Sequence, residues 1–306
     1  MDKNTMQIID KLPSNMADRI MRLPENIISS FEEIRIKNGY DTLLISGGNE
    51  HSLGDKNLVT PESLEEILNK LLNYSYYAYE EELSNGYITI EGGHRVGVCG
   101  KVIVDNDRIH MIKDISSLNI RRSRQFIGVS SKVMDTVVDH DNKSISNTLI
   151  ISPPKCGKTT LLRDIARSLS IKGYRVGICD ERSEIAGCHN GKSSYDLGPR
   201  SDILDGCPKA QGMIMLIRAM SPDVIITDEI GKKQDVKAIE EALCAGVKII
   251  TSIHGNSYED VVYSSVGELV RKHVFDTLIF LRSVPSTGTI HKVMKLSGMR
   301  KEEQDA

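Results

Sequence analysis

The chain has 306 residues, of which 40% are hydrophobic, 26% charged and 5% aromatic, as is ordinary for a soluble globular protein. This length allows one or two domains with a sizeable core. The net charge of −3 excludes a chain-wide basic field for nucleic acid, and no apolar run approaches the ~20 residues of a membrane span.

The cysteines indicate a reducing compartment. None belongs to a C-x-x-C pair, and Cys156 stands in a loop where a disulfide would be disruptive. Reduced thiols in the cytoplasm are the simplest interpretation. The full set is Cys99, Cys156, Cys179, Cys188, Cys207 and Cys244.

The first half of the chain predicts a smaller α+β domain over residues 1–140. Helical spacing runs from about Thr5 to Ile36, and Thr60 is a suitable cap for a helix that opens at Pro61. The polar stretch Asp139–Ser144 predicts a linker. Expected strands are Thr42–Ser46, Tyr87–Ile90, His94–Val98, Lys101–Val104, Ile109–Ile112 and Leu118–Arg122.

The second half, residues 141–306, alternates strand and helix and predicts a mainly parallel sheet covered by helices. Ligands bind such sheets at the carboxyl ends of the strands. Expected strands are Thr148–Ile151, Arg175–Cys179, Val224–Thr227, Lys248–Thr251 and Thr277–Leu281; expected helices are Lys158–Ser170, Pro208–Met220, Gln234–Ala245 and Tyr258–Val266.

A phosphate-binding loop is predicted between the first strand and first helix of this half. Its amide hydrogens would converge on nucleotide phosphates at a helix N-terminus. Lys158 would reach the terminal phosphates, and Thr159 would offer its hydroxyl to Mg²⁺. The loop is Ser152-Pro153-Pro154-Lys155-Cys156-Gly157-Lys158-Thr159-Thr160, and it predicts an NTP-hydrolysing enzyme.

The loop departs from the G-x-x-x-x-G-K-[ST] pattern at its first position, where Ser152 replaces glycine. A serine forced to positive φ costs about 1–2 kcal/mol, so backbone strain is expected there. The preset φ angles of Pro153 and Pro154 compensate in part.

Acidic residues follow two other predicted strands. Asp228 is expected to hold Mg²⁺, and Glu229 to orient and deprotonate the attacking water. Asp180, Glu181 and Glu184 follow the strand that ends near Cys179, and we expect Asp180 to extend the acidic metal site. An Asp-Glu pair at a strand end is common by chance, and an acidic turn is often only solvated. Their joint occurrence after a phosphate loop favours the functional interpretation.

His254 follows the strand Lys248–Thr251, where its imidazole can bind the γ-phosphate or link it to the sheet. A lone histidine is more often structural, but its position at a strand end favours a role at the site. Hydrolysis also needs positive charge against the transition state. One or two of five arginines are expected to supply it: Arg121, Arg122, Arg124, Arg200 and Arg218.

These motifs occur in the order found in the traffic ATPases of type II and type IV secretion systems. Within that superfamily the chain resembles the stage III sporulation protein AA family of endospore-forming bacteria, from about Leu23 to Lys295. The segments that carry this resemblance are Gly92–Gly97, Gly198–Ala210 and Met220–Gly231. The sequence departs from the family pattern at two places. Ser152 stands where the family usually has glycine, and the acidic box begins Asp180-Glu181 where secretion ATPases have the order Glu-Asp.

The resemblance implies a RecA-like ATPase domain that binds ATP and Mg²⁺, with Lys158, Glu181, Glu184, Glu229 and His254 in the catalytic set. It also implies a ring, expected to be a hexamer, on the cytoplasmic mother-cell side of the channel between mother cell and forespore. The ring would attach peripherally to the membrane through the channel's membrane proteins, and nucleic acid is not an expected partner.

Two alternatives remain open from the sequence. The first is a nucleotide-gated scaffold with little turnover, which Ser152 motivates. The second is a nucleic-acid-dependent motor. The fold permits it and the cluster Arg121–Arg124 leaves room for it, although the net charge argues against it.

Overall fold

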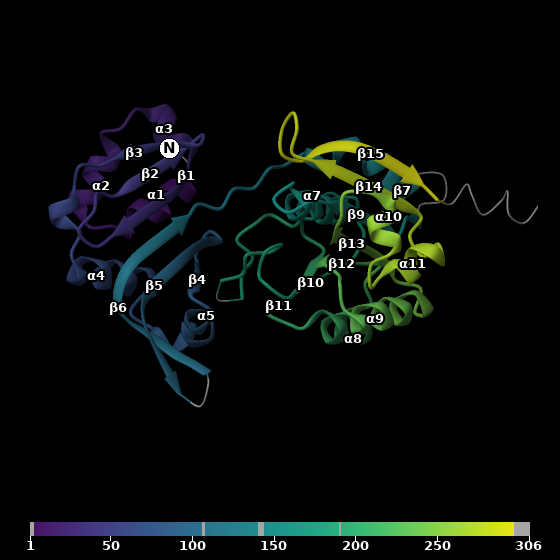
Figure 1. Ribbon diagram of the computed structural model, residues 1–306. Coiled ribbons are helices and arrows are strands. Elements are labelled where there is room, and N and C mark those ends of the chain that lie inside the picture. Colours follow the sequence, from purple (N-terminus) through teal and green to yellow (C-terminus); the bar gives the residue numbers. More distant parts are fainter. Residues whose placement is uncertain (1–2, 106–107, 140–143, 190, 297–306) are drawn as a thin grey trace, which may run out of the picture. The chain divides into compact units, whose positions relative to one another are not determined.

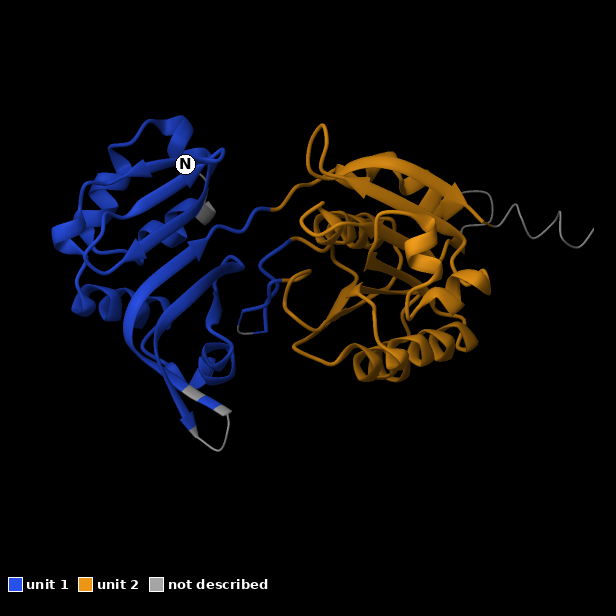
Figure 2. Cartoon of the chain, in the orientation of Figure 1, with its two compact units in different colours: residues 1–124, 187–195 blue, residues 125–186, 196–306 orange. Residues whose placement is uncertain are grey.

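The computed structural model describes residues 3–105, 108–139, 144–189 and 191–296, and the chain forms two compact units (Figure 1). Unit 1 comprises residues 1–124 and 187–195, and unit 2 comprises residues 125–186 and 196–306 (Figure 2). This division corrects the expected boundary at residue 140. The polar stretch there lies inside unit 2: residues 140–143 fall outside the described ranges, and the strands β7 (Val138–Asp139) and β8 (Ser144–Ile145) flank them.

Unit 1 is built on a six-stranded antiparallel sheet with the order β3-β2-β1-β6-β5-β4. Its strands are β1 (Phe31–Lys37), β2 (Leu43–Ser46), β3 (Asn49–Ser52), β4 (Tyr87–Ile90), β5 (His94–Asp105) and β6 (Arg108–Arg121). Its helices are α1 (Lys3–Ile9), α2 (Ser14–Met21), α3 (Glu25–Ser30), α4 (Pro61–Leu71) and α5 (Glu80–Ser84), with 3₁₀ turns η1 (Lys56–Leu58) and η2 (Tyr76–Tyr79). The α+β expectation is therefore confirmed for this unit.

The long hairpin β5–β6 replaces four short strands that the sequence predicted. The pairing register shifts between Cys99 and Lys101, which interrupts the alternation of side chains that marks a strand. Gly100 occupies this irregularity, and a Cβ there would lie 2.4 Å from the backbone oxygen of Lys113. A glycine in a strand thus allows the two backbones to approach closely. The helical expectation for Phe31–Ile36 was wrong, because this segment pairs as β1 in the middle of the sheet.

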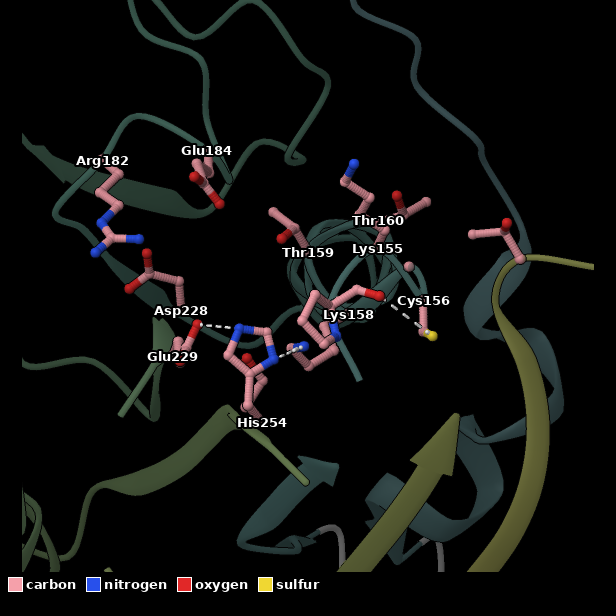
Figure 3. Close-up of a pocket in the computed structure, with 14 residues that line it drawn as sticks. Lys155, Cys156, Lys158, Thr159, Thr160, Arg182, Glu184, Asp228, Glu229 and His254 are labelled. Carbon is pink, nitrogen blue, oxygen red and sulfur yellow. Dashed lines mark hydrogen bonds and ion pairs between the residues drawn. The ribbon is translucent and has the colours of Figure 1, made fainter. Parts of the chain in front are cut away.

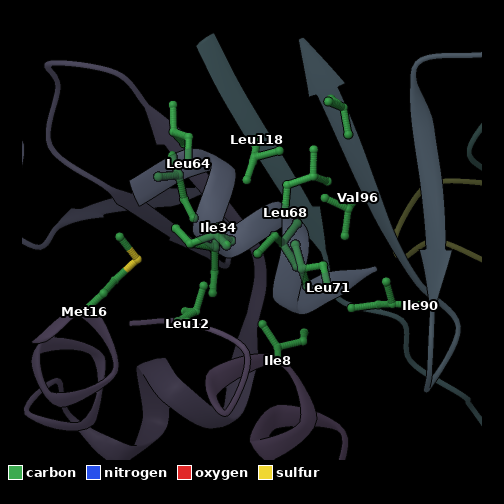
Figure 4. Packing of buried hydrophobic residues seen from close by; sticks show 14 of the residues in the cluster. Ile8, Leu12, Met16, Ile34, Leu64, Leu68, Leu71, Ile90, Val96 and Leu118 are labelled. Carbon is green, nitrogen blue, oxygen red and sulfur yellow. The ribbon is translucent and has the colours of Figure 1, made fainter. Parts of the chain in front are cut away.

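The core of unit 1 lies between the sheet and its helices (Figure 4). Helix α4 begins as predicted: the Thr60 hydroxyl accepts from the Ser63 amide, and Ser63 bonds back to the Thr60 amide. The helix then buries one apolar face, formed by Leu64, Ile67, Leu68 and Leu71. Opposite side chains include Ile34, Val96 and Leu118, each 1% exposed or less.

Replacing Ile34 by alanine is expected to lower the unfolding free energy by about 2–5 kcal/mol, because the fully buried side chain leaves a cavity. Chemical denaturation of the full chain measures the change. Val104→Ala on β5 is the control, since this side chain is 59% exposed and its loss is expected to change little. Equal effects of the two substitutions would contradict the packing described here.

Unit 2 is built on a seven-stranded sheet with the order β11-β10-β12-β13-β9-β14-β15, parallel except for β15. Its strands are β9 (Thr148–Ser152), β10 (Val176–Asp180), β11 (Ser201–Asp205), β12 (Val224–Glu229), β13 (Lys248–His254), β14 (Thr277–Arg282) and β15 (Thr289–Lys295). Its helices are η3 (Val129–Lys132), α6 (Met134–Val137), α7 (Lys158–Ile171), α8 (Lys209–Met220), α9 (Lys233–Cys244), α10 (Tyr258–Val262) and α11 (Gly267–Arg271). The mainly parallel α/β fold is confirmed.

The two edge strands β11 and β15 were not predicted, because neither has a buried apolar run. The helix expected over Tyr258–Val266 ends earlier, as α10 (Tyr258–Val262), and the short helix α11 follows after the expected range. Across the described residues, none of the helices combines the length and apolar character needed to cross a bilayer.

The segment Gly187–Tyr195 departs from unit 2 and packs within unit 1. The Tyr195 hydroxyl forms a hydrogen bond with the Ser123 hydroxyl. The ring of His189 stacks on Tyr79, with centroids 6.1 Å apart. Because this segment follows the strand β10 of unit 2, the chain crosses between the two units three times.

Candidate nucleotide-binding site

The carboxyl ends of the central parallel strands of unit 2 meet around one cavity of about 440 Å³ (Figure 3). In the pairing register Ser152 of β9 lies opposite His254 of β13, and Ser252 lies opposite Glu229 of β12. The cavity is lined by Pro154 to Thr160, Arg182, Glu184, Asp228, Glu229, Ser252, His254 and Thr287. The predicted phosphate loop, acidic strand end and histidine are thus brought together.

The predicted phosphate loop joins a fully buried strand to helix α7 without the strain that was expected at Ser152. Ser152 is the last residue of β9 and does not have a positive φ; Lys155 and Gly157 take that conformation instead, at 60° and 85°. The expectation of strain at Ser152 was wrong, because the strand extends one residue further than its apolar run. Space also favours glycine at Gly157, since a Cβ there would lie 3.1 Å from the Cα of Gly288.

Lys158 is turned back onto its own loop. Its Nζ donates to the backbone oxygens of Ser152 and Pro153, both at 3.2 Å, and lies 2.8 Å from Nδ1 of His254. The other imidazole nitrogen, Nε2, lies 2.8 Å from the carboxylate of Glu229. Burial lowers the pKa of Lys158, and the charge of Glu229 opposes this change. A continuous Lys158–His254–Glu229 chain therefore spans the cavity (Figure 3).

The end of β12 is fixed by hydroxyl hydrogen bonds to both neighbouring strands. Thr251 on β13 donates to the backbone oxygen of Asp228 at 2.8 Å, and Thr227 donates to the backbone oxygen of Cys179 on β10. Burial raises the pKa of Asp228, while the nearby ammonium of Lys209 opposes this change. These contacts hold two adjacent carboxylates, Asp228 and Glu229, at the mouth of the cavity.

The three carboxylates of the acidic box, Asp180, Glu181 and Glu184, have different partners. Asp180 accepts hydrogen bonds from the amides of Glu184, Ile185 and Ala186 at 2.8–3.0 Å, so it folds its own loop and does not line the cavity. Burial raises its pKa to about 6, although these amides act in the opposite direction. Glu184 lines the main cavity, whereas Glu181 points to Lys209. The structure thus offers no support for Asp180 as a metal ligand.

Lys209, at the start of α8, is a site residue that the sequence did not reveal. Its Nζ bonds to Glu181 and lies 3.0 Å from Oδ1 of Asp228. Burial acts to lower its pKa, but the two carboxylates raise it overall. Arg182 and Thr287 line the main cavity and were also not singled out. No sequence signal marks Lys209 or Thr287, whereas Arg182 stands inside the acidic box.

Of the five candidate arginines, Arg200 and Arg218 belong to unit 2 and do not line this cavity, whereas Arg121, Arg122 and Arg124 belong to unit 1. Arg122 and Arg124 bond to backbone oxygens near Phe31 inside unit 1. The other three are exposed: Arg121 is the last residue of β6, Arg200 directly precedes β11, and Arg218 lies on α8.

The oxygen donors of the site are suited to magnesium. The Thr159 hydroxyl and the carboxylates of Asp228 and Glu229 line one cavity, and oxygen ligands are those that Mg²⁺ prefers. Oδ1 of Asp228 is buried and forms an ion pair with Nζ of Lys209 at 3.0 Å. Among the described residues no three His, Cys, Asp or Glu side chains form a complete cage. This arrangement fits a metal held largely by phosphates and water.

Comparison with known proteins identifies the family. The family model "Sporulation stage III, protein AA" matches residues 3–301. The chain belongs to this family. Stage III sporulation protein AA of Bacillus subtilis (strain 168) is 42% identical over 299 residues, which cover 95% of each chain. The resemblance that the motifs suggested is therefore confirmed.

Solved structures confirm the fold of this family member. The Legionella pneumophila ATPase DotB aligns with a TM-score of 0.60 and 15% identity, over 96% of this chain and 84% of that one. The pilus retraction motor PilT, solved with bound ADP, aligns with a TM-score of 0.62 and 15% identity, over 92% and 86% of the two chains. Both are ATPases or motors by name, and at this identity they support the fold alone.

Replacing Asp180 by alanine is expected to lower the unfolding free energy by about 3 kcal/mol, because three amides lose their acceptor. Thermal unfolding in the presence of EDTA measures the change without any contribution from metal. Asp205→Ala is the control, since among the described residues the carboxylate of this exposed residue accepts one hydrogen bond, from the hydroxyl of Ser183. A stability loss that appears only when Mg²⁺ is added would instead restore Asp180 as a metal ligand.

Proposed function

We propose that the chain is a magnesium-dependent ATP hydrolase that energises or assembles the channel between mother cell and forespore. The observation that carries this proposal is the Lys158–His254–Glu229 chain across a phosphate-binding loop. It connects the lysine that would bind phosphate with the carboxylate that would act on water. A purely structural histidine would not need partners of both kinds.

In this proposal, entry of ATP draws Lys158 away from its own loop. Its Nζ would exchange the backbone oxygens of Ser152 and Pro153 for the terminal phosphates of the nucleotide. His254 would then lose the Lys158 donor at Nδ1, and a proton taken up at this nitrogen would let it donate to the γ-phosphate. Nε2 would keep its contact with Glu229, so that the carboxylate stays oriented.

Glu229 would act as the general base. Its carboxylate is about half exposed and borders the cavity, so a water molecule can reach it. Thr159 and Asp228 would hold Mg²⁺, which supplies positive charge against the phosphates. Arg182 and Glu184 line the far side of the cavity and would contact the polyphosphate or its metal.

We also propose that hydrolysis requires a ring of subunits. The candidates Arg200 and Arg218 are exposed and do not line the cavity of unit 2, and Arg121 is an exposed residue of unit 1. A heterologous contact repeated around a closed ring, expected to be a hexamer, would bring one of them to a neighbour's phosphate. Membrane proteins of the sporulation channel would anchor this ring on the mother-cell side.

The two alternatives are weaker on specific grounds. The scaffold without turnover was motivated by Ser152, but this residue lies in a strand and carries no strain of positive φ. A nucleic-acid motor requires a basic surface, and the cluster near Arg121 uses Arg122 and Arg124 to bind the backbone of unit 1. Stimulation of hydrolysis by added DNA or RNA would revive the second alternative.

Lys158→Ala is expected to abolish nucleotide binding and turnover, and Glu229→Gln to leave binding intact while lowering turnover about 100-fold or more. Phosphate release and binding of a fluorescent ATP analogue measure the two effects. Lys172→Ala, at the other end of the same helix, is the matched control. Normal hydrolysis in either of the first two variants would refute the assignment.

Ring formation is expected to depend on nucleotide, because the phosphate supplies one side of the interface contact. Mass measurement of the Glu229→Gln variant with ATP and Mg²⁺ should give a closed oligomer, and EDTA should reduce its mass. An oligomer whose size does not respond to nucleotide would show that the interface forms without the phosphate contact.

A further inference from the structure

Lys209 is an unusual residue for its position in the fold. It is the first residue of α8, and a lysine in the first turn faces the positive end of the helix dipole. Its side chain is only 8% exposed, so its charge has also lost most of its hydration. Both circumstances are unfavourable, and a buried ammonium persists only where carboxylates compensate for it.

The compensating carboxylates belong to the proposed catalytic site. Lys209 bonds to Glu181 of the acidic box and pairs with Asp228 at 3.0 Å. These groups line a second cavity of about 260 Å³, which shares Arg182, Asp228 and Glu229 with the main one. The buried ammonium thus sits against the same carboxylate that is proposed to hold magnesium.

Lys232 provides a natural comparison. Its Nζ lies 3.6 Å from the other carboxylate oxygen of Glu181, but its side chain is 70% exposed. Water screens this charge, so it contributes little to the field at Asp228. Two lysines therefore approach one acidic group, and only Lys209 does so while buried.

We propose that Lys209 is a positioning residue that serves as an internal counter-ion of the magnesium site. It holds Asp228 and Glu181 in place before metal arrives, and it competes with magnesium for Asp228. This inference rests on the proposed function, since it presupposes a metal at Asp228. Its consequence is that Mg²⁺ alone binds weakly, and that the negative charge of the nucleotide phosphates is needed to bring the metal in.

The proposal predicts how magnesium affinity depends on the charge at residue 209. Lys209→Gln keeps a hydrogen-bond donor for Glu181 but removes the charge, so the nucleotide-free protein should bind Mg²⁺ about ten-fold more tightly. Lys209→Arg keeps the charge and should bind as the wild type does. Lys232→Gln should change the affinity by less than about two-fold, because its charge is screened.

Titration of the nucleotide-free proteins with MgCl₂, followed by calorimetry and by thermal unfolding, measures these affinities. Tighter binding by Lys209→Gln alone supports the proposal. Unchanged or weaker binding by that variant, or parallel changes in Lys209→Gln and Lys209→Arg, overturns it. If Lys209→Gln does not fold without metal, Lys209→Met provides a second neutral variant, and folding of either one should be recovered by Mg²⁺; no recovery also overturns the proposal.

These measurements use no nucleotide, so they are separate from the test of the proposed function. A wild-type protein that neither binds ADP nor hydrolyses ATP would refute the proposed ATPase, whatever the affinities for Mg²⁺. An active ATPase in which residue 209 leaves Mg²⁺ binding unchanged would refute only the role of Lys209.

Discussion

The register of the parallel strands in unit 2 is the constraint on which the site depends. Ser152 lies opposite His254, Ser252 opposite Glu229, and Cys179 opposite Thr227. Strands that run in the same direction and end level with one another deliver residues from four distant parts of the chain to one edge. A shift of one residue in any strand would turn its side chains to the other face of the sheet. The hydroxyl bonds between β10, β12 and β13 fasten this alignment where the apolar runs end.

The central strands and their motifs could be predicted because burial leaves a direct mark on sequence. Strands covered on both faces are continuous apolar runs, so β9, β12 and β13 can be recognised in the sequence. The polar residues that follow these runs mark the carboxyl ends of the strands. Edge strands have no such mark. The edge strands β11 and β15 are half-exposed and have no continuous apolar run. The inner strand β1 was missed for another reason: its apolar residues have a spacing that also suits a helix. Their pairing is decided by the neighbouring strands, which lie far away in sequence.

The partners of individual side chains were less predictable than their presence at the site. Asp180 ends β10 and Glu184 lies four residues later, yet the first accepts hydrogen bonds from backbone amides and the second lines the cavity. The direction in which the loop turns decides this, and charge pattern alone does not encode it. Lys209 could not be predicted for a similar reason. A lone lysine at the start of an apolar helix is ordinary in sequence, and its role depends on the carboxylates that the fold brings to it.

The passage of Gly187–Tyr195 through unit 1 has a consequence for synthesis on the ribosome. Unit 1 lacks the partner of Ser123 and the ring that stacks on Tyr79 until residue 195 has left the exit tunnel. At that moment the strands β11 to β15 of unit 2 have not yet left the tunnel. The usual order, in which an N-terminal domain is complete before the next one starts, is therefore unavailable to this chain. The nascent protein must carry an unfinished first unit and a half-built sheet together, a period in which a chaperone would find exposed edges to bind.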